Sequence, residues 1–168
     1  MVVFICRHMG KKKATVSKDL IKDCFVREVR VNYVATTTEQ FKISGPEDIA
    51  VFSRSVVLDN GREQFIAIYL DGAHTVAAYS LISIGSANCT TVHRREVFQR
   101  AVLVGAVSLV IAHNHPSGKN TPSQEDLSMT KRLLQSADIL GIKLLDHVIV
   151  TDSSHQSLRI EDAELWQC

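Results

Sequence analysis

The feature that most constrains the fold is the interleaving of β-rich runs with helical segments after residue 42. The runs REQFIAIYL and TVAAYSLIS flank Asp71-Gly72, a dipeptide typical of hairpin turns, so we expect a β-hairpin over residues 62–83. Two further strands are expected in SLVIAHNH and IKLLDHVIVT. Helices are expected in SGPEDIAVFSRSVV, HRREVFQRAVLVGA and TPSQEDLSMTKRLLQSADIL. Strands interleaved with about three helices indicate a single α/β or α+β domain.

Residues 1–42 differ from the rest and are expected to form a basic N-terminal segment with a lead-in strand. The stretch RHMGKKKATVSKD has no apolar periodicity. Lys11–Lys13 could contact phosphates, although three lysines on such a segment are more often simply solvated. The run REVRVNYV alternates Val29, Val31 and Tyr33 with polar residues, which predicts a half-buried strand. We therefore place the main domain at residues 43–168.

Charge, cysteine usage and the start of the chain narrow the class of protein. A net charge of +1 over 168 residues gives no general argument for binding nucleic acid or a membrane surface. The four cysteines include no C-x-x-C pair, which fits reduced thiols better than a disulfide framework or a cysteine zinc site. The apolar start MVVFIC ends at Arg7 and is too short for a signal peptide or a spanning helix. The cytoplasm is the expected compartment, with no membrane partner.

Two histidines stand one residue apart at the end of the apolar run SLVIAHNH. Residues i and i+2 of a strand point to the same face, so His113 and His115 can reach one point in space while Asn114 points the other way. A buried strand is also a rigid support for metal ligands. Taken alone, however, the tripeptide is more often simply the polar end of a strand.

The segment TPSQEDL, which follows, contains Ser123 and, three residues later, Asp126. This spacing resembles a capping box, which would give both residues a purely structural role. A competing start signal is present, because Thr121 can act as N-cap with Pro122 at the first helical position and Gln124 at the third. With that start, Ser123 and Asp126 would be free to act together on one face of the first helical turn.

The two histidines and the aspartate would give a metal three protein ligands and leave a fourth position for water. This is the arrangement of catalytic rather than structural zinc. Ser123, beside the aspartate, could donate a hydrogen bond to a developing oxyanion. A general base is also needed, and the residue spacing does not choose between Glu63, directly before a strand, and Glu96, on the helix HRREVFQRAV.

The pattern His113-x-His115-Pro, followed by Ser123-x-x-Asp126, resembles the JAMM motif of MPN-domain (JAB-type) zinc metallopeptidases. Many members of that superfamily cleave isopeptide bonds to ubiquitin-like modifiers. The resemblance implies one catalytic Zn²⁺ held by His113, His115 and Asp126, with Ser123 as a further catalytic residue. The superfamily also places a glutamate before a strand beginning Phe-apolar. Glu63 matches that context and Glu96 does not, so the resemblance assigns the base to Glu63.

Over residues 43–150 the chain is similar to the RadC branch of this superfamily, through the segments HRREVFQRAV, AHNHPSGKNTPSQEDLSMTKRL and LGIKLLDHVIV. The resemblance implies a single MPN/JAB-type domain with a mixed β-sheet, about three flanking helices and cytidine-deaminase-like layering. It also makes Asp146 and His147 candidates for groups that support the metal ligands or line the substrate cleft. A polar pair where a strand reaches the surface explains them equally well.

Three functions follow from the sequence. The first is a JAMM-type hydrolase that attacks an amide or isopeptide carbonyl of a protein or peptide. The second is a DNA-repair-associated or nucleic-acid-processing protein; full-length RadC proteins carry an N-terminal helix-hairpin-helix region, in place of which this chain has a short basic segment, so the link to DNA is weaker. The third is a non-catalytic MPN scaffold, disfavoured because all five site residues are present.

Overall fold

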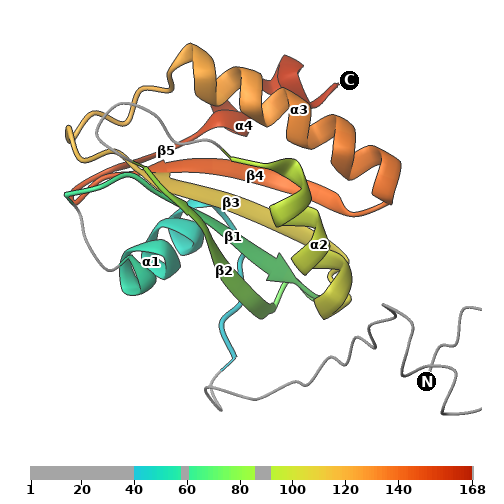
Figure 1. Ribbon diagram of the computed structural model, residues 1–168. Helices are drawn as coiled ribbons and strands as arrows, with labels where there is room; N and C mark the ends of the chain where they lie inside the picture. Colours follow the sequence, from blue (N-terminus) through green and yellow to red (C-terminus); the bar gives the residue numbers. More distant parts are fainter. Residues whose placement is uncertain (1–39, 58–60, 86–91, 168) are drawn as a thin grey trace, which may run out of the picture. The chain divides into compact units, whose positions relative to one another are not determined.

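A computed structural model describes residues 40–57, 61–85 and 92–167 (Figure 1). In this part of the chain, five strands form one sheet in the order β2-β1-β3-β4-β5. The β1/β2, β1/β3 and β4/β5 pairs are antiparallel and the β3/β4 pair is parallel, so the sheet is mixed. The elements are α1 (Pro46–Val56), β1 (Gln64–Leu70), β2 (Val76–Ile84), α2 (Arg94–Val104), β3 (Ser108–Asn114), α3 (Gln124–Leu140), β4 (Lys143–Val150), β5 (His155–Ser157), α4 (Leu158–Glu161) and the 3-10 helix η1 (Ala163–Trp166).

The sheet lies between two helical layers, and the alternation of side chains along each strand decides which layer a residue contacts. On one face, Phe65, Ala67 and Tyr69 of β1 pack with α2 and α3. On the other, Ile66 and Ile68 pack with α1. Figure 1 shows α1 and α3 on opposite sides of the sheet. The predicted α/β domain, with a mixed sheet and three long helices, is confirmed.

The predicted hairpin is present as β1 and β2, and Asp71 organises its turn. The Asp71 carboxylate accepts hydrogen bonds from the backbone N–H groups of Ala73 (2.8 Å) and Thr75 (2.9 Å). The chain just before α1 joins this turn, because Lys42 forms a β-bridge with Thr75. Residues 1–39 of the predicted basic N-terminal segment, including Lys11–Lys13 and the expected strand, lie outside the described residues.

One edge of the sheet gathers the ends of three strands. Because β1 is antiparallel to β3, with Phe65 opposite His113, β1 begins where β3 ends. Because β4 is parallel to β3, with Val150 opposite Asn114, β4 ends there too. In Figure 1 this edge is on the left. Glu63 directly precedes β1 and His115 directly follows β3, so the geometry of the strands brings them to the same edge.

A register shift in β4 determines which of its polar residues faces α3. Leu109 pairs with Leu144, but the next residue, Val110, pairs with Asp146, so Leu145 is one extra residue on β4. An extra residue reverses the face of every side chain after it. As a result His147, rather than Asp146, lies opposite Ile111 on the α3 side of the sheet.

No helix in the described ranges is long and apolar enough to cross a membrane.

Candidate metal centre

Four of the residues predicted for the site lie together at the shared strand edge. The ligand atoms of Glu63, His113, His115 and Asp126 are all within 4.8 Å of one another. They come from three elements or their ends: Glu63 from the start of β1, both histidines from the end of β3, and Asp126 from the first turn of α3. His113 and Asp126 are buried, whereas Glu63 and His115 are partly exposed, so the centre opens to solvent on one side.

The spacing of three of these groups suits a small tetrahedral cation. His113 Nε2 lies 2.9 Å from His115 Nε2 and 3.2 Å from Asp126 Oδ1, and His115 Nε2 lies 3.7 Å from Asp126 Oδ2. Ligands at roughly 2.0–2.1 Å from a tetrahedral zinc lie about 3.3 Å from one another. Nitrogen and carboxylate donors are also the types that zinc accepts. The residues present therefore fit a single zinc ion.

The hydrogen bond on the far side of His115 prepares its ring for a metal. His115 Nδ1 lies 2.7 Å from the carbonyl oxygen of Lys119. A carbonyl only accepts, so Nδ1 carries the proton and, in the neutral ring, Nε2 has a free lone pair. That lone pair points toward His113 and Asp126. Metal-binding histidines are usually held by such a bond from their second nitrogen.

The electrostatics of the centre keep Asp126 ionised. Burial alone would raise the pKa of its carboxyl group, but the close contacts with His113 and His115 and the hydrogen bond from the Ser123 hydroxyl outweigh burial and hold that pKa well below its usual range. In return, the hydrogen bond to Asp126 raises the pKa of His115, against the opposing effect of its partial burial. A buried carboxylate beside two imidazoles favours a bound cation, whether a proton or a metal ion.

The predicted helix start at Thr121 is wrong. Helix α3 begins at Gln124 with Ser123 as N-cap, and Ser123 and Asp126 form the capping box themselves. Ser123 Oγ accepts from the Asp126 N–H at 3.1 Å, and Asp126 Oδ2 accepts from the Ser123 N–H at 2.8 Å. An ionised carboxylate closes the box more strongly than the amide of Gln124 would at the third position of the expected helix.

The helix cap and a bound metal would therefore use the same aspartate, through different atoms. Oδ2 accepts both the backbone N–H and the hydroxyl of Ser123, the latter at 2.6 Å, while Oδ1 faces His113. Because the Ser123 hydroxyl has one proton, it can donate to an oxyanion only after turning away from Asp126. When it turns, the backbone N–H of Ser123 still holds the carboxylate in place.

Replacement of Ser123 tests its role as the N-cap of α3. Ser123→Ala should lower the free energy of unfolding by about 1 kcal/mol, and Ser123→Gly by only a few tenths, as is typical of N-caps. Urea denaturation measures both. Thr121→Ala is the control and should leave stability unchanged. A loss with Thr121→Ala but not with Ser123→Ala would contradict the observed start of α3.

Asn114, which the sequence placed only on the opposite face, holds the backbone on both sides of Glu63. Its Oδ1 accepts from the Gln64 N–H at 2.7 Å, and its Nδ2 donates to the Arg62 carbonyl at 2.9 Å. On the other side, the Gly85 N–H donates to the Glu63 carbonyl at 2.7 Å. These bonds fix the backbone that carries the Glu63 carboxylate. The sequence signal for this role was the alternation along β3, which directs Asn114 away from the metal ligands.

Loss of the Asn114 side chain should destabilise the domain without removing its metal. Asn114→Ala leaves the buried Gln64 N–H and the partly buried Arg62 carbonyl without this partner, which should cost about 2 kcal/mol of unfolding free energy. The matched control is Asn120→Ala, which removes a longer bond of 3.3 Å to the His155 carbonyl and should cost less. Urea denaturation and zinc content check both variants. Zinc loss in Asn114→Ala with unchanged stability would contradict the assigned role.

The two remaining predicted residues, His147 and Asp146, face opposite sides of the sheet. His147 is fully buried and contacts the centre, because its Nε2 lies 2.8 Å from His113 Nδ1. Burial and the neighbouring His113 hold the pKa of His147 well below its usual value. Asp146 faces the other way, and its two carboxylate oxygens share the proton of the Ser157 hydroxyl, which lies 2.9 and 2.7 Å from them. Burial raises the pKa of Asp146, against the opposing effect of this hydrogen bond. The contacts of Asp146 thus anchor β5 and α4 to the sheet.

Glu96, the other candidate for the general base, forms a local ion pair instead. Glu96 binds Arg100 one turn later on α2 at 2.7 Å, and it is outside the cluster of ligand atoms. Of the two glutamates left open by spacing, only Glu63 lies at the centre.

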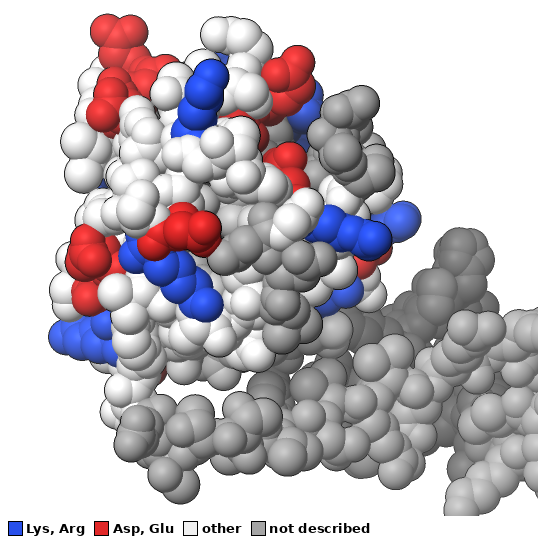
Figure 2. Space-filling model, turned by 90° about the vertical axis from the view of Figure 1, so that its left-hand side faces the viewer, with Lys and Arg blue, Asp and Glu red and all other residues white. Residues whose placement is uncertain are grey.

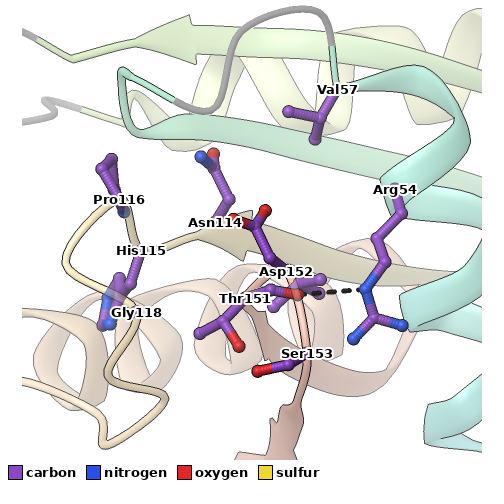
Figure 3. Close-up of a pocket in the computed structure, with 10 residues that line it drawn as sticks. Arg54, Val57, Asn114, His115, Pro116, Gly118, Thr151, Asp152 and Ser153 are labelled. Carbon is purple, nitrogen blue, oxygen red and sulfur yellow. Dashed lines mark hydrogen bonds between the residues drawn. The ribbon is translucent and has the colours of Figure 1, made fainter.

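A cavity of about 370 Å³ adjoins the metal centre through His115. Figure 3 shows His115 and Pro116 on one side of it and Arg54 on the other. The Arg54 guanidinium donates to the carbonyls of Thr151 (3.0 Å) and Ser154 (2.8 Å), and so holds the β4–β5 connection that forms the cavity floor.

Fold and site together define an α/β domain with a candidate mononuclear metal centre at its strand ends. A sequence model of the RadC-like JAB domain matches residues 43–164. The chain therefore belongs to the RadC-like JAB domain family.

Curated relatives agree with this assignment. The UPF0758 protein of Caldanaerobacter subterraneus subsp. tengcongensis is 42% identical over 126 residues, which cover 75% of this chain and 54% of the relative. That of Methanosarcina mazei is 39% identical over 120 residues, covering 71% and 52%. That of a Picosynechococcus species is 42% identical over 134 residues, covering 80% and 55%. The chain spans about half the length of the curated relatives it matches.

Proposed function

We propose that this chain is a zinc-dependent hydrolase of the JAMM type that cleaves amide or isopeptide bonds in a protein or peptide substrate. The observation that carries the proposal is the convergence of Glu63 with His113, His115 and Asp126 within 4.8 Å, from elements far apart in the sequence. Three of these groups suffice to hold a metal, which leaves Glu63 for chemistry. A structural zinc site has four protein ligands and no such spare group.

Zinc, when bound, lowers the pKa of water toward about 7 and polarises a carbonyl group. The protein groups supply the proton transfers and the positioning. The Glu63 carboxylate accepts the proton of the attacking water and delivers it to the leaving amine. The Ser123 hydroxyl turns from Asp126 and donates to the oxyanion that develops on the carbonyl. Asn114 keeps Glu63 in reach of the water by fixing the backbone on both sides of it.

The cavity beside His115 provides room for substrate residues next to the scissile bond. It is bordered by the Pro116–Gly118 turn and by the β4–β5 connection. Of the four clustered residues, His115 lines this cavity, so a peptide lying there would approach the centre beside His115. Its mixed lining, from Val150 to the polar Thr151 and Ser153, suits a peptide better than a purely apolar ligand.

The distribution of charge on the face that carries the metal centre favours a hydrolase over a nucleic-acid-binding protein. Figure 2 shows that, among the described residues on this face, Lys and Arg side chains are intermingled with Asp and Glu. A surface that follows a phosphate backbone needs a continuous basic stripe. The described residues of this face form no such stripe. The DNA alternative also draws on Lys11–Lys13, which lie outside the described residues. It predicts salt-dependent DNA retention that is lost when these lysines are replaced.

The proposal is tested by zinc-dependent cleavage. The full chain is loaded with one zinc equivalent and incubated with peptides containing either main-chain amides or isopeptide links to a lysine side chain. Mass spectrometry detects the released amine. We expect cleavage that stops with a chelator and returns when zinc is added. Zinc binding without cleavage of any peptide in the panel would favour the non-catalytic scaffold, and cleavage that persists in chelator would exclude the metal mechanism.

A further inference from the structure

A chain of buried polar groups runs from the metal centre into the domain. His113 Nδ1 lies 2.8 Å from His147 Nε2, and His147 Nδ1 lies 2.6 Å from Thr130 Oγ1. Thr130 Oγ1 in turn lies 2.6 Å from the backbone carbonyl of Asp126, four residues earlier on α3. His147 and Thr130 are both fully buried. The chain thus begins at one candidate ligand and ends at the backbone of another.

The donor and acceptor roles of these groups determine where each proton in the hydrogen-bonded series lies. The Asp126 carbonyl can only accept, so it takes the single proton of the Thr130 hydroxyl. Thr130 Oγ1 must then accept from His147, which places the His147 proton on Nδ1. A neutral imidazole has one N–H, so His147 Nε2 is an acceptor and the shared proton belongs to His113 Nδ1. His113 Nε2 therefore carries a free lone pair.

The lone pair of His113 meets the lone pair of His115. The bond from His115 Nδ1 to the Lys119 carbonyl independently leaves His115 Nε2 unprotonated. The two bare nitrogens are 2.9 Å apart and face the Asp126 carboxylate. With both rings neutral, three electron-rich groups converge with no proton between them. Such an arrangement repels itself unless a cation lies at its centre.

The fold holds the His113 and His147 rings in this orientation; together with Thr130 they form a hydrogen-bonded relay. The register shift in β4 directs His147 to the α3 side, beside His113. The Phe65 ring stacks on His113, with centroids 6.1 Å apart, and meets His147 edge-on at 5.7 Å. Both imidazoles are thus packed against the same buried ring, in addition to their hydrogen bonds.

We propose that Thr130 and His147 are positioning residues that fix His113 in its Nδ1–H form and so keep His113 Nε2 ready to bind a metal. This inference rests on the metal centre of the proposed function but not on its chemistry. It assigns to Thr130 a role in metal capture although Thr130 touches no metal.

The zinc affinity of two Thr130 variants tests the relay. Thr130→Val keeps the shape of the side chain but removes the acceptor for His147. His147 can then move its proton to Nε2 and donate to His113 Nδ1, which puts the His113 proton on the nitrogen that should bind metal. We expect zinc affinity about 10–100-fold lower, as is typical when the support of a ligand is lost. Thr130→Ser retains the hydroxyl and should bind zinc as the parent chain does. Competition with a chromophoric chelator measures both.

Nitrogen-15 NMR of the metal-free parent chain gives a second readout that does not depend on a variant folding or on hydrolysis. We expect His113 and His147 each to show a protonated Nδ1 and an unprotonated Nε2. A protonated Nε2 on either ring, or parental zinc affinity in folded Thr130→Val, would overturn the relay. A chain that shows the expected tautomers and affinities but cleaves no peptide would contradict only the proposed function.

Discussion

Replacing Glu63 with glutamine should lower peptide hydrolysis about 100- to 10,000-fold, the usual range for loss of a general base. Glutamine keeps the shape of the side chain but cannot take a proton from water. Since His113, His115 and Asp126 remain, zinc content should stay at one ion per chain. The turnover number and zinc content of the same purified sample measure both effects.

Glu96→Gln is the matched control for Glu63→Gln. It makes the same chemical change at the glutamate that pairs with Arg100 on α2, and it should leave hydrolysis unchanged. Loss of zinc together with activity in Glu63→Gln would mean that Glu63 is a fourth metal ligand rather than the base. Full activity in Glu63→Gln would remove it from the mechanism.

Replacing Asp126 with asparagine should weaken zinc binding by more than the roughly 10–100-fold seen when a group supporting a ligand is lost. The substitution removes the only charged ligand of the three while retaining an oxygen that can accept from the Ser123 N–H. The helix start should therefore survive while the metal is lost. Zinc titration measures the affinity, and circular dichroism checks the helix.

Glu125→Gln removes the same charge one residue earlier and serves as the control. Glu125 is exposed in the first turn of α3 and is not among the clustered ligand atoms. Its variant should bind zinc normally. Equal weakening in both variants would show that the net charge of the helix start, and not ligation by Asp126, governs zinc affinity.

The sequence predicted that His113 and His115 would lie close together, and the structure places them within 4.8 Å of Asp126 and Glu63, because their position depends on local geometry. Alternation along β3 places His113 and His115 on one face whatever the rest of the fold does. The hairpin at Asp71-Gly72 was also confirmed, since turn chemistry is a local signal. Choosing Glu63 over Glu96, however, needed the family resemblance.

The helix start was wrong because two capping signals overlapped by two residues. Thr121 and Ser123 each have a suitable residue three positions later, and local preference alone does not rank them. The tertiary contact decides: Asp126 is held by His113 from β3 as well as by Ser123. The assumption that a capping residue is unavailable for a site was also mistaken. One oxygen of Asp126 accepts from the Ser123 N–H and caps the helix, while the other faces His113.

The contacts that hold the candidate ligands in place could not be predicted from the sequence. His147 reaches His113 only because of the extra residue in β4, and a register shift in a parallel pair has no sequence signature here. Without that shift, Asp146 would face the centre. Thr130 carries a weak signal, four residues after Asp126 on the same helix face, but that spacing is equally common for an ordinary threonine in a helix.

The most direct test of the metal centre is the zinc content of the full chain purified without added metal, measured by mass spectrometry beside the His113→Ala variant. We predict one zinc per chain in the parent and none in the variant, together with a loss of thermal stability in the variant. A parent chain that contains no zinc, and a variant with unchanged metal content and stability, would contradict the assignment of His113, His115 and Asp126 as a metal centre.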